Sequence, residues 1–134
     1  LGASNAMNNR EGDLAGWARE LTQGAGVDMV MDCVGTALFG DSLFAIGVHG
    51  RLVNCGNASG DEATIPSLGY LFHSGISIIG SDPYEPSEFG PVWEEFCSGD
   101  YQVEIDSTYP LEAAGEAQEK MLSGDFFGKI ILTP

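Results

Sequence analysis

Two kinds of segment alternate along this chain: stretches with the periodicity of an amphipathic helix, and short runs of apolar and β-branched residues. The first stretch, Asp13–Gln23, has apolar residues at helical spacing, with Asp13 as a candidate N-cap and Gly24 just past its end. The run Val27–Val34 follows, and its nearly continuous apolar character is typical of a strand covered on both faces. This alternation predicts parallel strands joined by helical crossovers, which is the pattern of a doubly wound α/β sheet.

The middle of the chain repeats the alternation. Thr36 is a candidate N-cap for a second helix that ends near Gly50, and Arg51–Cys55 is then predicted as a strand. A short helix around Ser67–Phe72 precedes a third predicted strand, Ile76–Ile79. Because this strand is short, β-branched and uncharged, we expect it at the outer edge of the sheet, where it would be free to pair.

The last third of the chain begins with a proline-rich segment, Asp82–Gly90. This segment predicts a loop that leads into a helix ending at Gly99. A further helix is predicted at Leu111–Ser123, directly after Pro110, and a closing strand at Lys129–Thr133. A second structural region is therefore expected in this part of the chain.

Acidic residues far outnumber basic ones. Twenty Asp and Glu stand against five Lys and Arg, which gives a formal net charge of -15. A phosphate backbone or an anionic membrane surface would be repelled, so nucleic acid and membranes are not expected as partners. No apolar run approaches the roughly 20 residues that span a bilayer, and no secretory pattern begins the sequence, so we expect a cytoplasmic protein.

Three cysteines, Cys33, Cys55 and Cys97, lie far apart in the sequence. Their odd number and wide spacing support neither a disulfide framework nor a zinc site. We expect them to be small buried hydrophobic side chains, and no metal ligand is assigned.

A glycine-rich turn between a strand and the following helix would cradle a dinucleotide pyrophosphate, and these residues contain none. Gly24 and Gly26 are the nearest candidates, but they precede a strand and lack a third glycine. They are interpreted as a helix end and a turn.

Eight short motifs follow one another along nearly the whole chain. They are Leu1-Gly2-Ala3, Gly24-Ala25-Gly26-Val27-Asp28, Asp32-Cys33-Val34-Gly35, Gly50-Arg51-Leu52-Val53, Gly56-Asn57-Ala58-Ser59-Gly60, Ile78-Ile79-Gly80-Ser81, Pro110–Ala114 and Gly128–Leu132. In this order and spacing the series resembles the second half of medium-chain dehydrogenases/reductases, the superfamily of zinc-type alcohol dehydrogenases and quinone oxidoreductases.

The resemblance implies an α/β fold with a partial Rossmann-like doubly wound parallel sheet of about four strands, followed by a C-terminal helix and strand. Residues 1–100 would form a partial nucleotide-binding domain without its first strand-helix units. Residues 101–134 would form the tail that returns to the catalytic domain in the family. The family spacing also implies a strand at Ala6–Asn8.

The resemblance implies a cofactor site at the carboxyl edge of the sheet. The nucleotide would be flanked by Cys33, Val34 and Gly35. The nicotinamide would lie along Gly56 and Asn57, and its carboxamide would meet backbone groups of Gly80 and Ser81. The pyrophosphate would be approached by Lys129. Alternatively, the glycines are tight exits from strands and the lysine is a surface residue. No catalytic residue is assigned.

The implied function is that of a C-terminal fragment of an NAD(P)-dependent oxidoreductase, inactive alone and binding NAD(P) weakly or not at all. The alternative is a non-catalytic remnant of the family that oligomerises or binds a partner. In either case we expect a homodimer formed through Ile76–Ile79, because exposed edge strands pair readily.

Overall fold

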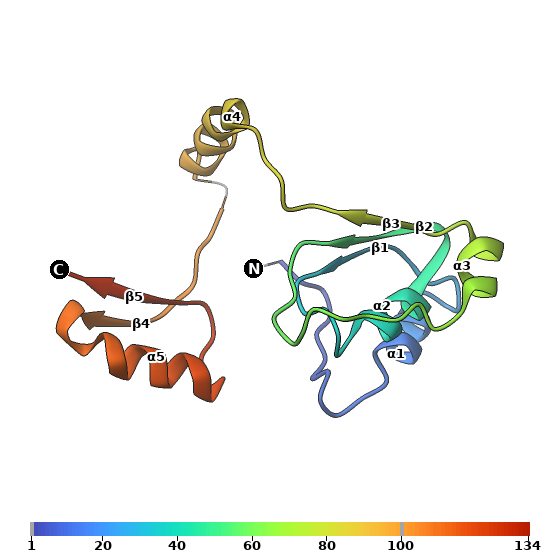
Figure 1. Ribbon diagram of the computed structural model, residues 1–134, viewed down its shortest axis with the longest axis horizontal. Helices are drawn as coiled ribbons and strands as arrows, with labels where there is room; N and C mark the ends of the chain where they lie inside the picture. Colours follow the sequence, from blue (N-terminus) through green and yellow to red (C-terminus); the bar gives the residue numbers. More distant parts are fainter. Residues whose placement is uncertain (1, 100) are drawn as a thin grey trace. The chain divides into compact units, whose positions relative to one another are not determined.

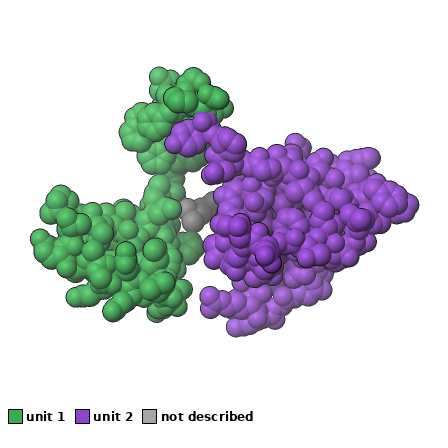
Figure 2. Space-filling model, viewed as in Figure 1, with its two compact units in different colours: residues 1, 85–134 green, residues 2–84 purple. Residues whose placement is uncertain are grey.

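The computed structural model describes residues 2–99 and 101–134, so the motif residue Leu1 lies outside the described residues. The chain divides into two compact units, which Figure 2 colours separately: residues 2–84 and residues 85–134. The division lies between Tyr84 and Glu85. The boundary expected between residues 100 and 101 involves a residue outside the described ones, and it stays a prediction.

Residues 2–84 form the α/β unit that the alternation predicts (Figure 1). Its three strands pair in parallel in the order β1-β2-β3. Their bounds are Val27–Asp32 for β1, Ile46–Asn54 for β2 and Ser77–Gly80 for β3, and the helices are α1 Leu14–Leu21, α2 Phe39–Ala45 and α3 Leu68–Ser74. Leu43, Ile46, Leu52 and Ile76 form the buried core, which joins α2 to the sheet.

Two of the predicted helix starts are confirmed by their caps. The Asp13 carboxylate accepts a hydrogen bond of 2.9 Å from the backbone N–H of Gly16, and the Ser67 hydroxyl accepts one of 3.1 Å from that of Tyr70. Each side chain satisfies a backbone donor that the first helical turn leaves free.

The second helix is shorter than predicted, and β2 begins earlier. Thr36 does not cap it, because its hydroxyl donates to the Glu62 carbonyl at 2.6 Å. The helix ends at Ala45, and Ile46 pairs with Val27 of β1 instead of continuing the helical face. Ile46 is completely buried. Burial and strand pairing therefore override the helical periodicity at this position.

The strand expected at Ala6–Asn8 does not form. This segment turns instead: the Asn8 carbonyl accepts from the N–H of Glu11 at 3.1 Å, and its side-chain oxygen accepts from the N–H of Arg10 at 3.1 Å. Asparagine favours such local turns because its side chain bonds to the backbone nearby. The described part of this sheet thus has three strands, and the expectation of about four was wrong.

Residues 85–134 contain α4 Pro86–Cys97, β4 Ile105–Pro110, the short 3-10 helix η1 Leu111–Ala113, α5 Ala114–Ser123 and β5 Lys129–Thr133. Strands β4 and β5 pair in parallel, and η1 and α5 connect them along the chain. The closing helix and strand were predicted, whereas β4 was not. In contrast to the loop expected up to Gly90, α4 begins at Pro86, because Glu85 and Glu88 form a capping box and proline is tolerated at the first helical position.

In the part of the chain that the structure describes, no helix combines the length and the apolar character that crossing a bilayer requires.

Candidate functional site

A pocket of about 470 Å³ opens where β2 and β3 end. Two short segments that follow these strands form most of its wall. The lining residues are Asn54, Cys55, Gly56, Asn57, Asp61, Gly80, Ser81, Asp82 and Pro83. Ligands of open α/β sheets bind outside the carboxyl ends of the strands, and this pocket lies at that edge.

Four of the eight predicted site residues meet in this pocket: Gly56, Asn57, Gly80 and Ser81. They come from positions more than twenty residues apart in the sequence, and the parallel register of Asn54 with Gly80 brings the two groups together. The N–H of Ser81 donates to the Asn54 carbonyl at 2.9 Å and extends the pairing one residue beyond β3.

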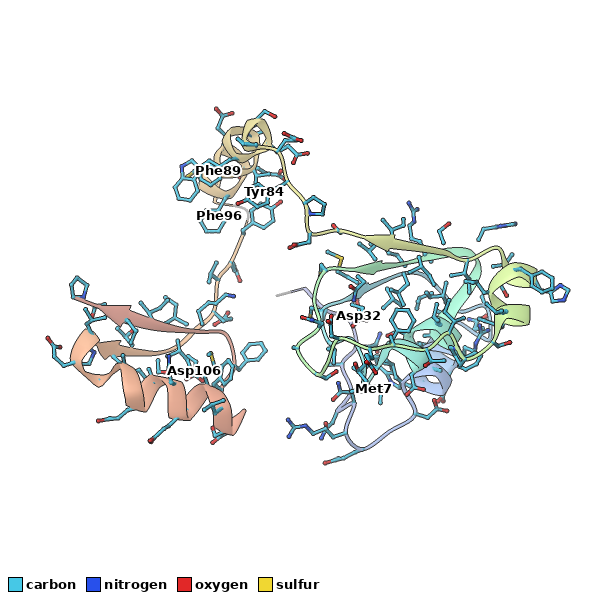
Figure 3. All side chains as sticks on the ribbon, in the orientation of Figure 1. Met7, Asp32, Tyr84, Phe89, Phe96 and Asp106 are labelled. Atoms are coloured by element: carbon cyan, nitrogen blue, oxygen red, sulfur yellow. The ribbon has the colours of Figure 1, made fainter. Side chains whose placement is uncertain are left out.

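Asp32, the last residue of β1, stabilises the turn that follows this strand (Figure 3). Its side chain is 3% exposed, and its carboxylate accepts hydrogen bonds of 2.8 and 3.1 Å from the N–H groups of Val34 and Gly35. The side-chain amide of Asn54 approaches the same carboxylate at 3.4 Å. A buried carboxylate requires such donors. Asp32 belongs to one of the eight motifs but was given no role, although an Asp followed by Gly three residues later is a usual turn signal.

Gly35 and Gly56 have a packing reason to be glycine. A Cβ at Gly56 would lie 3.0 Å from the Cys33 carbonyl oxygen, and one at Gly35, where φ is +80°, would lie 2.7 Å from that of Gly60. In contrast, a Cβ at Gly80 would meet no atom within 4 Å. The interpretation of tight strand exits therefore accounts for the first two glycines, whereas the space beside Gly80 is open to a ligand.

The polar groups of the pocket are amides, a hydroxyl, a thiol, backbone groups and carboxylates. The Asn57 amide donates to the Asp61 carboxylate at 2.9 Å, and that of Asn54 donates to the Gly56 carbonyl at 2.9 Å. Asp61 and Asp82 both line the pocket, and its lining includes no basic residue. This lining suits a neutral or cationic ring with hydrogen-bonding substituents, and it disfavours phosphate.

Val34 faces a second, smaller pocket of about 360 Å³ in the same unit, together with Arg10, Leu38 and Ser59. Arg10 is a cation beside the end of β1 that the sequence analysis did not single out. Its position becomes visible only in the structure, where Asn9 and Arg10 line one pocket with Val34.

Lys129 lies in the other unit, on β5, where it lines a pocket of about 330 Å³ with Glu104 and Phe127. Its backbone N–H donates to the Glu104 carbonyl at 2.8 Å. The structure describes this unit by itself, so Lys129 is not brought together with the other predicted residues, and its role toward a pyrophosphate stays a prediction.

The cysteines differ from the expectation of buried hydrophobic side chains. Cys33 and Cys97 are exposed and Cys55 is half-buried, and all three are free thiols. Cys33 follows the end of β1, and its exposure results from the turn that Asp32 organises. Within residues 2–99 and 101–134, no three His, Cys, Asp or Glu side chains are grouped so that they could hold a metal ion.

This chain resembles known proteins in both sequence and structure. The model of the zinc-binding dehydrogenase family matches residues 1–132. Quinone oxidoreductase-like protein 2 of Mus musculus is 34% identical over 141 aligned positions, which cover 98% of this chain and 40% of the mouse protein.

Two solved structures show the same likeness. The alcohol dehydrogenase of Aeropyrum pernix is 28% identical with a TM-score of 0.85, covering 99% of this chain and 38% of the other. A mycobacterial protein solved in complex with NADPH is 27% identical with a TM-score of 0.78, covering 99% of this chain and 44% of the other.

The chain spans about two fifths of the length of the curated relatives that match it from end to end. These relatives and structures include quinone oxidoreductases and alcohol dehydrogenases, as the motif series implied. The match over residues 1–132 shows that the chain belongs to the zinc-binding dehydrogenase family, within the medium-chain dehydrogenases/reductases, and represents the C-terminal region of that superfamily.

Proposed function

We propose that this chain is the nicotinamide-binding part of an NAD(P)-dependent oxidoreductase that transfers hydride to or from a carbonyl, alcohol, quinone or activated alkene. The observation that carries the proposal is the pocket at the ends of β2 and β3, which unites Gly56, Asn57, Gly80 and Ser81. The motif series selected these residues as cofactor contacts without reference to their positions in space.

The chemistry of the pocket fits the nicotinamide end of the cofactor. A carboxamide offers an acceptor oxygen and an NH2 group with two donor hydrogens, and the side chains of Asn57 and Ser81 contain both donors and acceptors that can pair with them. The open space at Gly80 would admit a flat ring beside the strand end. The bound cofactor supplies the hydride chemistry itself, and the chain's residues would bind and orient the ring.

The rest of the cofactor finds less support in these residues. They contain no glycine-rich pyrophosphate turn, and the carboxylates of Asp61 and Asp82 repel phosphate. We therefore expect this chain alone to bind NAD(P) more weakly than micromolar and to show no turnover. The direct assay supplies NADH or NADPH with a panel of quinones, enones and aldehydes, and sustained oxidation by contaminant-free protein would contradict the expectation.

Saturation-transfer NMR tests the orientation of the bound cofactor. We expect the chain to transfer saturation to the nicotinamide protons of NADH more strongly than to the adenine protons. Gly80→Val should remove this transfer while the fold is kept, because the new side chain enters open space in a strand that accepts β-branched residues. Gly115→Ala, on α5 and also in open space, is the matched control and should change nothing.

Two results would count against the proposal. Stronger transfer to adenine would place the other end of the cofactor in the pocket, and unchanged transfer in Gly80→Val would place the ring elsewhere. Lys129→Ala should weaken any remaining affinity if Lys129 contacts the pyrophosphate. Complete absence of binding, combined with a stable assembly of the chain, would favour the alternative of a non-catalytic family remnant.

A further inference from the structure

Two cysteines follow the ends of adjacent strands, and one of them, Cys55, lines the pocket. Cys33 directly follows the last residue of β1, and Cys55 directly follows the last residue of β2. The final residues of these strands, Asp32 and Asn54, are register partners in the parallel pairing. The two cysteines therefore occupy the next positions after two adjacent strands, although 21 residues separate them in the sequence.

Hydrogen bonds hold the two strand ends together at this point. The Cys55 N–H donates to the Asp32 carbonyl at 2.8 Å, and the Cys55 sulfur itself lies 3.5 Å from the same oxygen. The Cys33 carbonyl accepts from the N–H of Ala58 at 3.3 Å. The Cys55 thiol is thus directed at the peptide group that joins Asp32 to Cys33.

This spacing suits a disulfide bond. Paired strands lie about 4.7 to 4.9 Å apart, and disulfides join residues whose Cα atoms are about 4.4 to 6.8 Å apart. Cys33 is exposed, so a dissolved oxidant reaches it, whereas Cys55 is half-buried against the pocket. Such a pair provides one thiol that reacts first and a second thiol that resolves the product.

We propose that Cys33 and Cys55 form an oxidisable dithiol at the ends of β1 and β2. Hydrogen peroxide would oxidise the Cys33 thiolate to a sulfenic acid and release hydroxide. The Cys55 thiol would then attack that sulfur, form the disulfide and release water. Overall, two thiols lose two electrons and two protons, and one peroxide is reduced to two waters.

The disulfide would change the wall of the pocket, because Cys55 is one of its lining residues. It would also add a covalent bond between the turn after β1 and the segment after β2, which hydrogen bonds already join. The proposal rests on the positions of the two sulfur-bearing residues and on no assumption about the nucleotide, so it stands or fails separately from the proposed function.

The experiment treats the whole chain with a slight molar excess of hydrogen peroxide and then alkylates the remaining thiols. We expect the titratable thiols to fall from three to one, with the surviving label on Cys97. Trypsin combined with a glutamate-specific protease separates the cysteines onto residues 21–51, 52–62 and 96–104. Mass spectrometry should find the first two peptides joined under non-reducing conditions and separate after reduction.

Variants of single cysteines provide the controls. Cys97→Ser should form the same linked peptides, since its sulfur takes no part. Cys33→Ser should prevent the linkage and leave Cys55 free to alkylate. The proposal is overturned if peroxide leaves all three thiols titratable, if the linked peptides include residues 96–104, or if the bond joins two chains on a non-reducing gel.

Discussion

At the scale of single residues, Arg19 joins three parts of the α/β unit. Its guanidinium donates to the carbonyls of Gly24 at 2.8 Å, Phe44 at 2.9 Å and Ile46 at 2.9 Å, and also to the Tyr70 hydroxyl. The Tyr70 hydroxyl in turn donates to the Ile46 carbonyl at 2.6 Å. One side chain thus satisfies the carbonyls at the end of α2, where helical partners are missing.

Arg19→Ala should lower the free energy of unfolding by about 2 kcal/mol, because it removes the guanidinium donors from the carbonyls of Gly24 and Phe44 and leaves that of Ile46 with the Tyr70 hydroxyl. Arg19→Lys should recover only part of this loss, since an ammonium cannot reach divergent acceptors as the planar guanidinium does. Urea unfolding followed by circular dichroism gives the comparison. Arg10→Ala is the matched control in the same unit, and an equal loss in both variants would contradict the role given to Arg19.

At the scale of elements, one ion pair connects the strands and helix of residues 85–134. The Asp106 carboxylate of β4 pairs with Lys120 of α5 and accepts a hydrogen bond of 3.0 Å from the N–H of Phe127, just before β5. The hydrogen bond from Lys120, and next that from Phe127, hold the pKa of Asp106 at about 2, below its ordinary 3.8. The same pair raises the pKa of Lys120.

A carboxyl group whose pKa is lowered by folding stabilises the folded state above its unfolded pKa and loses this effect as the pH falls through the folded value. The contribution of Asp106 should therefore be complete above about pH 4 and fade toward pH 2. Asp106→Asn should lower the urea midpoint at pH 7 and reduce its decline between pH 4 and pH 2. Urea unfolding followed by circular dichroism measures these midpoints.

Glu116→Gln, also on α5, removes a carboxylate without removing the pair and serves as the control. The role of Asp106 would be contradicted if both substitutions shifted the acid transition equally.

At the scale of the whole molecule, we propose that two copies of the chain pair through β3. In the described residues this strand pairs with β2 alone, and Ile78 and Ile79 are 40% and 42% exposed. An edge strand with apolar side chains and unpaired backbone groups is a template for another strand, and a two-fold contact needs only one self-complementary surface.

Ile78→Lys should convert the dimer to a monomer or make the protein insoluble, because a charge at the paired edge opposes association. Analytical ultracentrifugation at high micromolar concentration measures the change. Leu122→Lys, at a side chain that is 86% exposed on α5, should leave the dimer intact. A monomeric wild-type chain under these conditions would contradict the proposal.

The elements that the sequence predicted well are those whose signals are local. Asp13 and Ser67 cap their helices, and the β-branched residues of β3 form the expected edge strand, because caps and propensities act within a few residues. The motif series likewise identified the family and four residues that share one pocket.

The sequence by itself determined the alternation of helices and strands, and with it the parallel α/β unit. Only the tertiary structure decided where β2 begins, since the burial of Ile46 is a property of the assembled core. It also decided that the segment after β2 lies beside the end of β1, where the Cys55 N–H donates to the Asp32 carbonyl. These contacts join residues about twenty positions apart, and their formation depends on strand register, which no local signal specifies.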